Sequence, residues 1–273
     1  MCPMPQSEGE DAADRYATVG TLRLRYRDEG QGAVLILVHG VGSRLEAWDG
    51  VVAALGGGFR TVRLDLRGHG LSDKPPGPYS LEEMVGDVAG LLDALGIARC
   101  HLAGFSLGGL IAQGFALWHG ERLDRLVLLS TVAGRTDAER ARVAERLLVV
   151  DQGLPGDHFR NSLSRWFTDA YLAAHPDVIA RAEAANKAND PKAYAAAYRV
   201  LATSDLADRL HAITAPTLVA TGEHDVGSNT RMARLMHERI AGSVLHIFPG
   251  MKHSILAEIP DAVADRLRTF LAG

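Results

Sequence analysis

The sequence predicts an α/β fold in which a mostly parallel sheet is flanked by helices and interrupted by a helical insertion. Continuous apolar runs of strand length alternate with helical patterns in the first half of the chain, as expected when helices cover both faces of a sheet. Strand-like runs vanish from about residue 132 to residue 212 and then return. We therefore expect a core formed by residues 15–131 and 213–273, with a helical cap inserted at 132–212.

The N-terminal part of the chain predicts a leader followed by a β-hairpin. Residues 1–14 are polar and acidic and contain two prolines, a composition that is typical of a disordered segment. Residues 18–27 alternate apolar and polar side chains on both sides of a turn at Gly20 and Thr21. Such alternation indicates half-buried strands, so we expect a hairpin at one edge of the sheet.

The remaining elements follow from apolar runs and helix-start patterns. Ser80 and Glu83 form a capping box before an apolar stripe of helical spacing, and Pro260 stands where a first helical turn accepts proline. The expected strands cover residues 33–38, 59–64, 98–103, 126–130, 216–221 and 244–248. The expected helices cover residues 81–95, 110–116, 230–240 and 261–271 in the core, and 138–150 and 192–201 in the cap.

Composition and charge favour a protein that acts on a small molecule. With 29 basic and 33 acidic side chains the net charge is −4, and no block of like charges suggests a nucleic-acid or membrane surface. Cys2 and Cys100 argue against a disulfide framework and for a reducing compartment. No secretory or transmembrane segment is recognisable, so we expect a cytoplasmic protein. No metal-ligand cluster or dinucleotide fingerprint is present, so we expect no metal and no other cofactor.

The stretch from Gly104 to Gly109, Gly-Phe-Ser-Leu-Gly-Gly, places a serine where a strand is expected to turn into a helix. A serine at such a turn is held in strained backbone geometry, and the glycines two residues before and after it let the strand and helix approach closely. Its hydroxyl then projects alone from the turn. Because the bare pattern often arises by chance, the strand and helix around Ser106 carry its interpretation as a nucleophile.

Three side chains of complementary chemistry follow strands of the predicted sheet. Ser106, Asp225 and His253 all come after strands, and open parallel sheets bind their ligands beyond the carboxyl ends of the strands. A serine hydroxyl needs a base to take its proton, and an imidazole needs a carboxylate to fix its tautomer. We therefore expect Ser106 as the nucleophile, His253 as the base and Asp225 as the orienting acid. The backbone N–H groups of Val41 and Leu107 are expected to form an oxyanion hole.

The chain resembles the α/β-hydrolase superfamily over about residues 16–271. The resemblance rests on five motifs in the order of that family: His39-Gly40-x-Gly42, Asp65-x-Arg67-Gly68-His69-Gly70-x-Ser72, Gly104-x-Ser106-x-Gly108-Gly109, Gly222-x-x-Asp225 and His253. It implies an α/β-hydrolase fold with a helical cap and a triad in the order Ser, Asp, His. In that family the acid follows the strand that here ends at Thr221, which matches Asp225.

Other titratable residues near these motifs are interpreted as structural. His39, His69 and Asp65 lie in motifs that the family uses to support loops. His224 directly precedes the expected acid and points elsewhere, and Asp205 is a weaker rival for the acid. Epoxide hydrolases carry ring-opening tyrosines in the cap but use an aspartate as nucleophile, so we interpret the cap tyrosines as packing or pocket lining: Tyr171, Tyr194 and Tyr198.

The cap is expected to select the substrate, because the sheet supplies only generic acyl-transfer chemistry. Its stretches Ser164-Arg165-Trp166-Phe167-Thr168 and Ala174-His175-Pro176 look similar to the caps of 3-oxoadipate enol-lactonases. A lid arginine can hold a carboxylate in two parallel hydrogen bonds, which suits a small acidic lactone or ester. We expect Arg165 to bind that carboxylate and Trp166 to line the pocket. The alternative for Arg165 is a solvated side chain with a packed stem.

Three other functions remain open at this point. A carbon–carbon bond hydrolase of ring-cleavage pathways shares the fold, but such enzymes usually have His-Gly-Ser-Gly-Pro-Gly and a Trp after the catalytic His, where this chain has His-Gly-Val-Gly-Ser and Ser254. A carboxylesterase of broad scope is a close alternative. A small-molecule receptor on a hydrolase fold is the alternative outside the enzymes.

Overall fold

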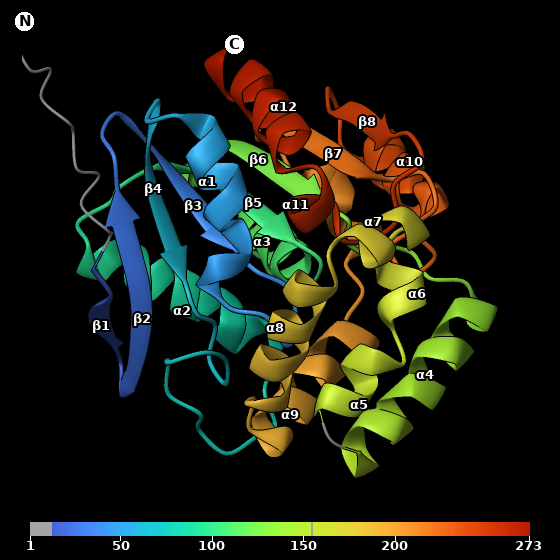
Figure 1. The fold of residues 1–273 in the computed structure, drawn as a ribbon. Coiled ribbons are helices and arrows are strands. Elements are labelled where there is room, and N and C mark those ends of the chain that lie inside the picture. Colours follow the sequence, from blue (N-terminus) through green and yellow to red (C-terminus); the bar gives the residue numbers. More distant parts are fainter. Residues whose placement is uncertain (1–12, 154) are drawn as a thin grey trace, which may run out of the picture.

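The computed structural model describes residues 13–153 and 155–273, which contain an eight-stranded sheet between two layers of helices (Figure 1). The strands stand in the order β1-β2-β4-β3-β5-β6-β7-β8. The pairs β1–β2 and β2–β4 are antiparallel, and all other neighbouring strands are parallel. The strands are β1 (Arg15–Val19), β2 (Leu22–Glu29), β3 (Ala33–Val38), β4 (Phe59–Leu64), β5 (Cys100–Phe105), β6 (Leu123–Leu129), β7 (Thr217–Gly222) and β8 (Val244–Phe248). The predicted α/β fold with a mostly parallel sheet is confirmed.

Helices follow most strands and fill the chain between β6 and β7. The helices before β7 are α1 (Asp49–Leu55), α2 (Leu81–Ala94), α3 (Leu107–Trp118), α4 (Asp137–Gln152), α5 (Pro155–Arg160), α6 (Leu163–Trp166), α7 (Asp169–Ala174), α8 (Pro176–Lys187) and α9 (Pro191–Thr203). Those after β7 are α10 (Thr230–Arg239), α11 (Ile255–Glu258) and α12 (Pro260–Ala272). Short 3-10 helices are η1 (Leu45–Trp48), η2 (Gly120–Arg122) and η3 (Ala207–Ala212).

The bounds predicted from the sequence agree closely with the observed bounds for several of these elements. The predicted strands 33–38, 59–64 and 244–248 coincide with β3, β4 and β8, and the predicted capping box of α2 is present. The strand expected from residue 98 begins two residues later, at Cys100, and it ends at Phe105, directly before Ser106 as its place at the turn predicts. Of the predicted disordered leader, all but Ala13 and Asp14 lies outside the described residues.

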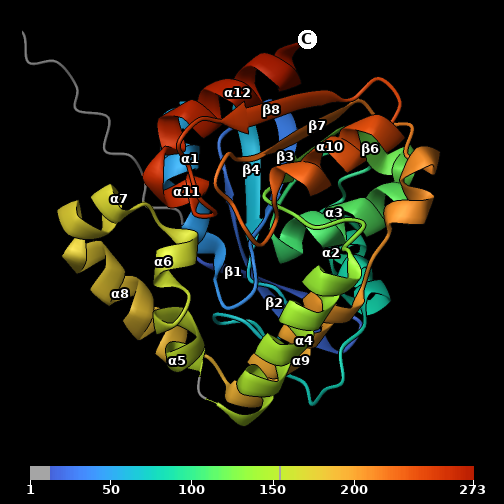
Figure 2. The ribbon, with the colours of Figure 1, turned by 90° about the vertical axis from the view of Figure 1, so that its right-hand side faces the viewer.

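Two apolar layers hold the sheet between its helices. Alternate side chains of β3 enter different layers, with Ile36 and Val38 on one face and Leu35 and Leu37 on the other. The first layer packs beneath α2, α3 and α10, and the second beneath α1, α11 and α12 (Figure 2). Burial of both faces explains why these strands are continuous apolar runs in the sequence.

The helices α4 to α9 gather at the edge of the sheet where the parallel strands end (Figures 1 and 2). This part of the chain contacts the loop after β3 directly: the side chains of Asn186 in α8 and of Asn189 just after that helix each donate a hydrogen bond to the carbonyl of Gly42, at 3.0 and 2.9 Å. We keep the name cap for residues 132–212. A molecule bound at the carboxyl ends of the parallel strands would therefore lie between the sheet and the cap.

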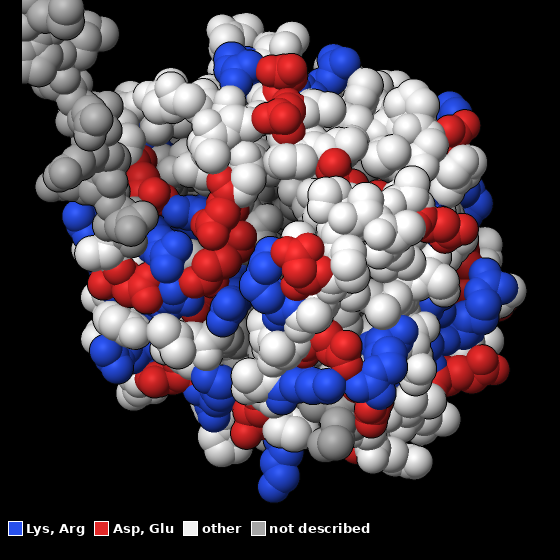
Figure 3. Space-filling model, viewed as in Figure 1, with Lys and Arg blue, Asp and Glu red and all other residues white. Residues whose placement is uncertain are grey.

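Charged side chains of both signs are interleaved on the face that contains β1, β2 and α8 (Figure 3). Residues of these elements form ion pairs, such as Asp28 of β2 with Arg60 of β4 and Arg181 with Asp177 of α8. Such mutual neutralisation leaves little net potential over this face. None of the described helices has the length and apolar character needed to cross a bilayer.

Candidate active site

Ser106 stands at a sharp turn between β5 and α3. Its backbone has φ 55° and ψ −114°, a left-handed conformation that is rare outside glycine. A Cβ added to Gly104 would lie 2.1 Å from the carbonyl oxygen of Gly108, and one added to Gly108 would lie 2.2 Å from that of Val38. No side chain fits at either position, so the glycines allow the strand and helix to approach and leave the Ser106 hydroxyl at the apex.

His253 and Asp225 form a hydrogen-bonded pair beside this turn. His253 Nδ1 lies 2.7 Å from Asp225 Oδ2, and Asp225 Oδ1 accepts hydrogen bonds from the N–H groups of Gly227 and Ser228, both at 2.9 Å. Burial disfavours ionisation of Asp225, but the charge of His253 and these hydrogen bonds outweigh it and hold the pKa of the carboxyl below its ordinary value. Asp225 is thus an ionised carboxylate that fixes the orientation of the imidazole.

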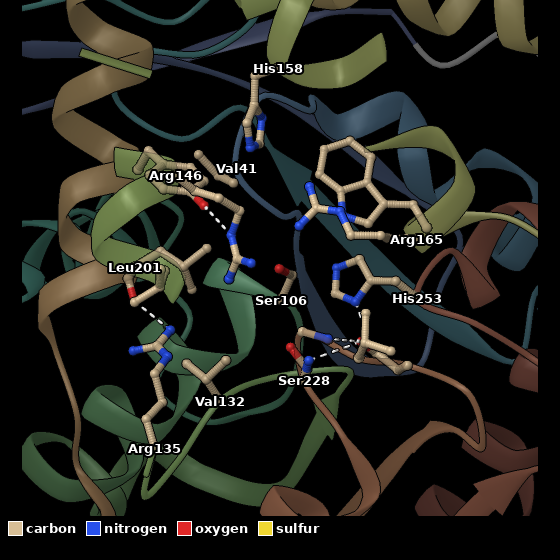
Figure 4. Close-up of a pocket in the computed structure, with 16 residues that line it drawn as sticks. Val41, Ser106, Val132, Arg135, Arg146, His158, Arg165, Leu201, Ser228 and His253 are labelled. Carbon is tan, nitrogen blue, oxygen red and sulfur yellow. Dashed lines mark hydrogen bonds and ion pairs between the residues drawn. The ribbon is translucent and has the colours of Figure 1, made fainter. Parts of the chain in front are cut away.

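The hydroxyl of Ser106 and the ring of His253 face the same space (Figure 4). Because Nδ1 is bound to Asp225, Nε2 is the ring nitrogen that is left to act on a proton. The hydrogen bonds of these described residues do not include one between Ser106 Oγ and His253 Nε2. The two groups are near neighbours that a bound substrate can bring into contact, as is common in free enzymes.

The N–H groups of Val41 and Leu107 donate no hydrogen bond to any described residue. Leu107 is the first residue of α3, where a helix leaves its N–H groups unpaired, and Val41 lines the pocket at Ser106. The neighbouring Gly40 is close enough that an added Cβ would lie 3.1 Å from Ser106 Cβ. Two donors are therefore available beside the serine.

Two buried histidines hold the loop that carries Val41. His39 Nε2 accepts the N–H of Leu66 at 3.1 Å, and His69 Nε2 accepts the N–H of Gly42 at 3.0 Å. Burial lowers the pKa of His39 to about 4 and, together with the nearby His39, that of His69 to about 3. Both rings are neutral acceptors at neutral pH and support the loop, as their motifs predict.

Because His39 and His69 are buried as neutral rings, we expect the folded protein to lose stability in mild acid. Both folded-state pKa values lie below the unfolded value of about 6.5, so the unfolded chain binds more protons as the pH falls. The stabilisation is complete above about pH 6.5 and is lost toward pH 4 for His39 and pH 3 for His69. As the pH falls from 7 to 5, each of the two histidines is expected to lower the free energy of unfolding by roughly 2 kcal/mol.

Urea unfolding of His69→Gln at several pH values checks this prediction. Glutamine can accept the same N–H without titrating, so the variant should lose less stability per pH unit than the wild type. His211→Gln, at an exposed position, should follow the wild type. Parallel pH profiles of His69→Gln and wild type would contradict a neutral buried His69.

A cavity of about 70 Å³ lies in front of Ser106 and is rich in arginine. The guanidinium of Arg135 is already used in hydrogen bonds within the protein. It donates to the carbonyl oxygens of Leu201 at 2.8 Å and of two neighbouring residues at the end of α9. Arg146 has a weaker anchor, with Nε 3.4 Å from Tyr198 Oη. None of the arginines that line the cavity forms an ion pair with a carboxylate of the described residues. The cavity is therefore electropositive.

The structure brings the predicted Arg165 and Trp166 to the same cavity as the serine. Arg165 is half-buried, and its guanidinium donates to Ser162 Oγ and points toward Ser106 (Figure 4). Burial, followed by the charge of Arg146, lowers the pKa of Arg165 from its ordinary value. This placement favours a role in the cavity over the alternative of a solvated side chain with a packed stem.

The cap segment that carries Trp166 is bound to the loop that carries His253. The Trp166 carbonyl accepts the N–H of Ser254 at 2.9 Å, and the two rings, Trp166 and His253, lie with centroids 6.3 Å apart. The Glu258 carboxylate accepts the N–H of Thr168 at 3.1 Å. The cap thus helps to position the imidazole as well as to enclose the cavity.

The rival residues are used elsewhere. Asp65 accepts the N–H groups of Leu45 and Leu71, both at 2.8 Å, and so anchors a loop. His224 is exposed, and Asp205 accepts N–H groups at the base of the cap, including that of Gly134 at 2.9 Å. These three side chains do not line the cavity.

Arg146 and His158 are among the cavity residues that the sequence analysis missed. Arg146 lies three residues after Val143 and four before Val150, both buried, so a charge on the apolar stripe of α4 was the available clue. His158 has no sequence clue. Its Nδ1 lies 2.7 Å from Tyr194 Oη, and its buried Nε2 has no partner among the described residues. Burial, followed by the charges of Arg165 and Arg146, lowers the pKa of His158 to about 4.

Comparison with known proteins agrees with this architecture. The 3-oxoadipate enol-lactonase 2 of Acinetobacter baylyi is 29% identical over 255 residues, which cover 93% of this chain and 91% of the relative. The crystal structure of an enol-lactonase from Burkholderia xenovorans superposes with a TM-score of 0.89 at 32% identity, covering 95% of this chain and all of that one. A hydrolase from Pseudomonas aeruginosa superposes with a TM-score of 0.88 at 32% identity, covering 97% of this chain and all of that one. Residues 33–260 match the family described as alpha/beta hydrolase fold, and the chain belongs to this family of hydrolases.

Proposed function

We propose that the protein is a serine hydrolase that cleaves a small, carboxylate-bearing ester or lactone through an acyl-enzyme on Ser106. The observation that carries the proposal is the hydrogen bond between the buried Asp225 and the partly buried His253, whose ring faces a serine at a strained turn. We further propose that residues 15–131 and 213–273 form the catalytic core and residues 132–212 the cap that selects the substrate.

The chemistry follows from the positions of these groups. His253 Nε2 takes the proton of the Ser106 hydroxyl while Oγ bonds to the acyl carbon, and Asp225 stabilises the imidazolium that forms. The N–H groups of Val41 and Leu107 donate to the oxyanion. The imidazolium then gives its proton to the leaving oxygen as the acyl–oxygen bond breaks. A water molecule, deprotonated by His253, attacks the acyl-enzyme and releases the acid and the free serine.

The acidic character of the substrate is supported by the cavity. Arg165 reaches into it without a carboxylate partner among the described residues, and a guanidinium binds a carboxylate through two parallel hydrogen bonds. Two of the similar proteins are named enol-lactonases, which supports the lactone class. A substrate carboxylate at Arg165 would hold the acyl carbon over Ser106.

Stopped-flow measurement with 4-nitrophenyl acetate tests the acyl-enzyme. We expect a burst of nitrophenol close to one equivalent of enzyme, and a peptide containing Ser106 that carries one acetyl group after acid quenching. Linear release without a burst and with no acetylated peptide would count against a covalent intermediate, provided deacylation is the slower step. A screen of small lactones, esters and vinylogous diketones would then define the bond that is cleaved.

Arg165→Gln is expected to raise KM about tenfold or more for esters that carry a carboxylate and to leave neutral esters nearly unchanged. The reason is the loss of a charge-assisted, bidentate contact that only an acidic substrate makes. Steady-state kinetics with 4-nitrophenyl hydrogen succinate and 4-nitrophenyl butyrate provide the comparison. An equal loss on both esters would mean that Arg165 shapes the pocket and does not bind a carboxylate.

A further inference from the structure

Two arginines face each other across the catalytic cavity. Arg146 comes from α4 and Arg165 from α6, and both guanidinium groups point toward Ser106 (Figure 4). They differ from Arg135, the third arginine of the cavity, which is buried and donates to carbonyl oxygens at the end of α9. Two cationic groups therefore remain directed at the place where a substrate binds.

Among the described residues, no carboxylate forms an ion pair with Arg146 or Arg165. Asp225 lines the cavity but is held by His253 and by the N–H groups of Gly227 and Ser228. Glu145 lines an adjoining hollow together with Arg146 and Arg165, and its side chain is exposed. Like charges in a partly desolvated cavity repel each other, and the charge of Arg146 indeed disfavours the charged form of Arg165. Such a pair is costly in the free protein and is relieved when anions bind.

Each arginine has its own anchor and its own free N–H groups. Arg146 is held through Nε by Tyr198, and Arg165 through Nη2 by Ser162, on different elements of the cap. The remaining donors of each guanidinium have no partner among the described residues and suit a separate carboxylate. The ring of His158 also lines the cavity and, being neutral, adds no charge to it.

We propose that Arg146 is a second carboxylate-binding residue and that the natural substrate carries two carboxylate groups besides the bond that is cleaved. This inference rests on the proposed serine hydrolase function and specifies its substrate class. One carboxylate binds Arg165, the other binds Arg146, and the acyl carbon lies over Ser106. A monocarboxylate leaves one of the two guanidinium groups without an anionic partner.

Three esters that share a leaving group but differ in their number of free carboxylates test the proposal. They are 4-nitrophenyl butyrate, 4-nitrophenyl hydrogen succinate and the terminal mono-4-nitrophenyl ester of propane-1,2,3-tricarboxylic acid, which carry no, one and two carboxylates. For the wild type we expect kcat/KM to rise about tenfold or more with each carboxylate. In Arg146→Gln the gain from the second carboxylate should disappear, while the butyrate and hydrogen succinate esters keep their rates within about threefold.

Arg234→Gln is the control, because Arg234 on α10 is exposed and lines neither the cavity nor the hollow beside it. It removes the same charge and should retain the preference for two carboxylates. If Arg146→Gln slowed the mono- and dicarboxylate esters equally, the two arginines would share one carboxylate and the proposal would be wrong. A wild type with no preference for the dicarboxylate would overturn it as well.

The proposed function is judged separately, by the Ser106-dependent hydrolysis of the neutral ester. If that activity is absent, serine catalysis fails, but the anion site can still be measured by calorimetry with succinate, which carries two carboxylates, and butyrate, which carries one. Tighter binding of succinate to the wild type, lost in Arg146→Gln, supports the site. Equal affinities, or an Arg146→Gln variant that binds both as the wild type does, contradict it. Arg146→Lys, which keeps the charge, provides a variant if Arg146→Gln does not fold.

Discussion

Replacement of Ser106 by alanine is expected to remove nearly all esterase activity, with kcat falling by about 10⁶-fold. This is the size of the loss when the nucleophile of a Ser-His-Asp hydrolase is removed. The hydroxyl is the atom that forms the acyl bond, and the neighbouring donors cannot replace it. Steady-state release of nitrophenol from 4-nitrophenyl butyrate measures the effect.

Ser130→Ala is the control for this substitution. Ser130 is also a buried serine with a positive φ, 44°, and it follows β6, the strand next to β5. It does not line the cavity, so its loss should change kcat only a few-fold. Near-wild-type turnover in Ser106→Ala, with contaminating esterases excluded by a second purification, would refute the mechanism.

Asp225→Asn is expected to lower kcat by about 10⁴-fold while the protein stays folded. An asparagine Oδ1 can still accept the N–H groups of Gly227 and Ser228, so the turn should persist. Its amide nitrogen, however, would donate to His253 Nδ1 and leave Nε2 protonated, which prevents the ring from acting as a base. Kinetics with 4-nitrophenyl butyrate and a thermal unfolding curve measure the two effects.

Asp205→Asn provides the comparison, because Asp205 is the other acid that the sequence offers. Its carboxylate accepts the N–H groups of Gly134 and Ala207, at 2.9 and 3.0 Å, and lies outside the cavity. We expect a modest loss of stability and little change in kcat. If Asp205→Asn abolished activity and Asp225→Asn did not, the assignment of the acid would have to be exchanged.

Much of the fold could be predicted because its determinants are local. The run 33–38 is apolar at every position because β3 is covered on both faces, and it coincides with the strand. Ser80 and Glu83 satisfy each other's backbone N–H groups, so the start of α2 could be read directly. The start of β5 was less predictable, because Ala98 and Arg99 continue the pattern before the strand but only Cys100 to Phe105 pair with β6.

The candidate site also contains residues that the sequence predicts and residues that it does not. Ser106, Asp225 and His253 could be expected to converge, because each follows a parallel strand and such strands end on one side of the sheet. Arg146 and His158 could not be found, since their approach to the cavity depends on how α4 and α5 pack over the strand ends. No pattern within a few residues determines that packing.

By itself, the sequence determined the order of the strands and helices, the glycines around Ser106 and the acid and base that follow later strands. These features depend on apolar periodicity, backbone conformation and the parallel arrangement of strands, which act over short stretches of chain. Only the tertiary structure decided that Arg146, His158 and Arg165 face the same serine without an acidic partner in the described residues. Their encounter is decided by the packing of the cap on the core, because side chains far apart in the chain meet there through the positions of whole helices.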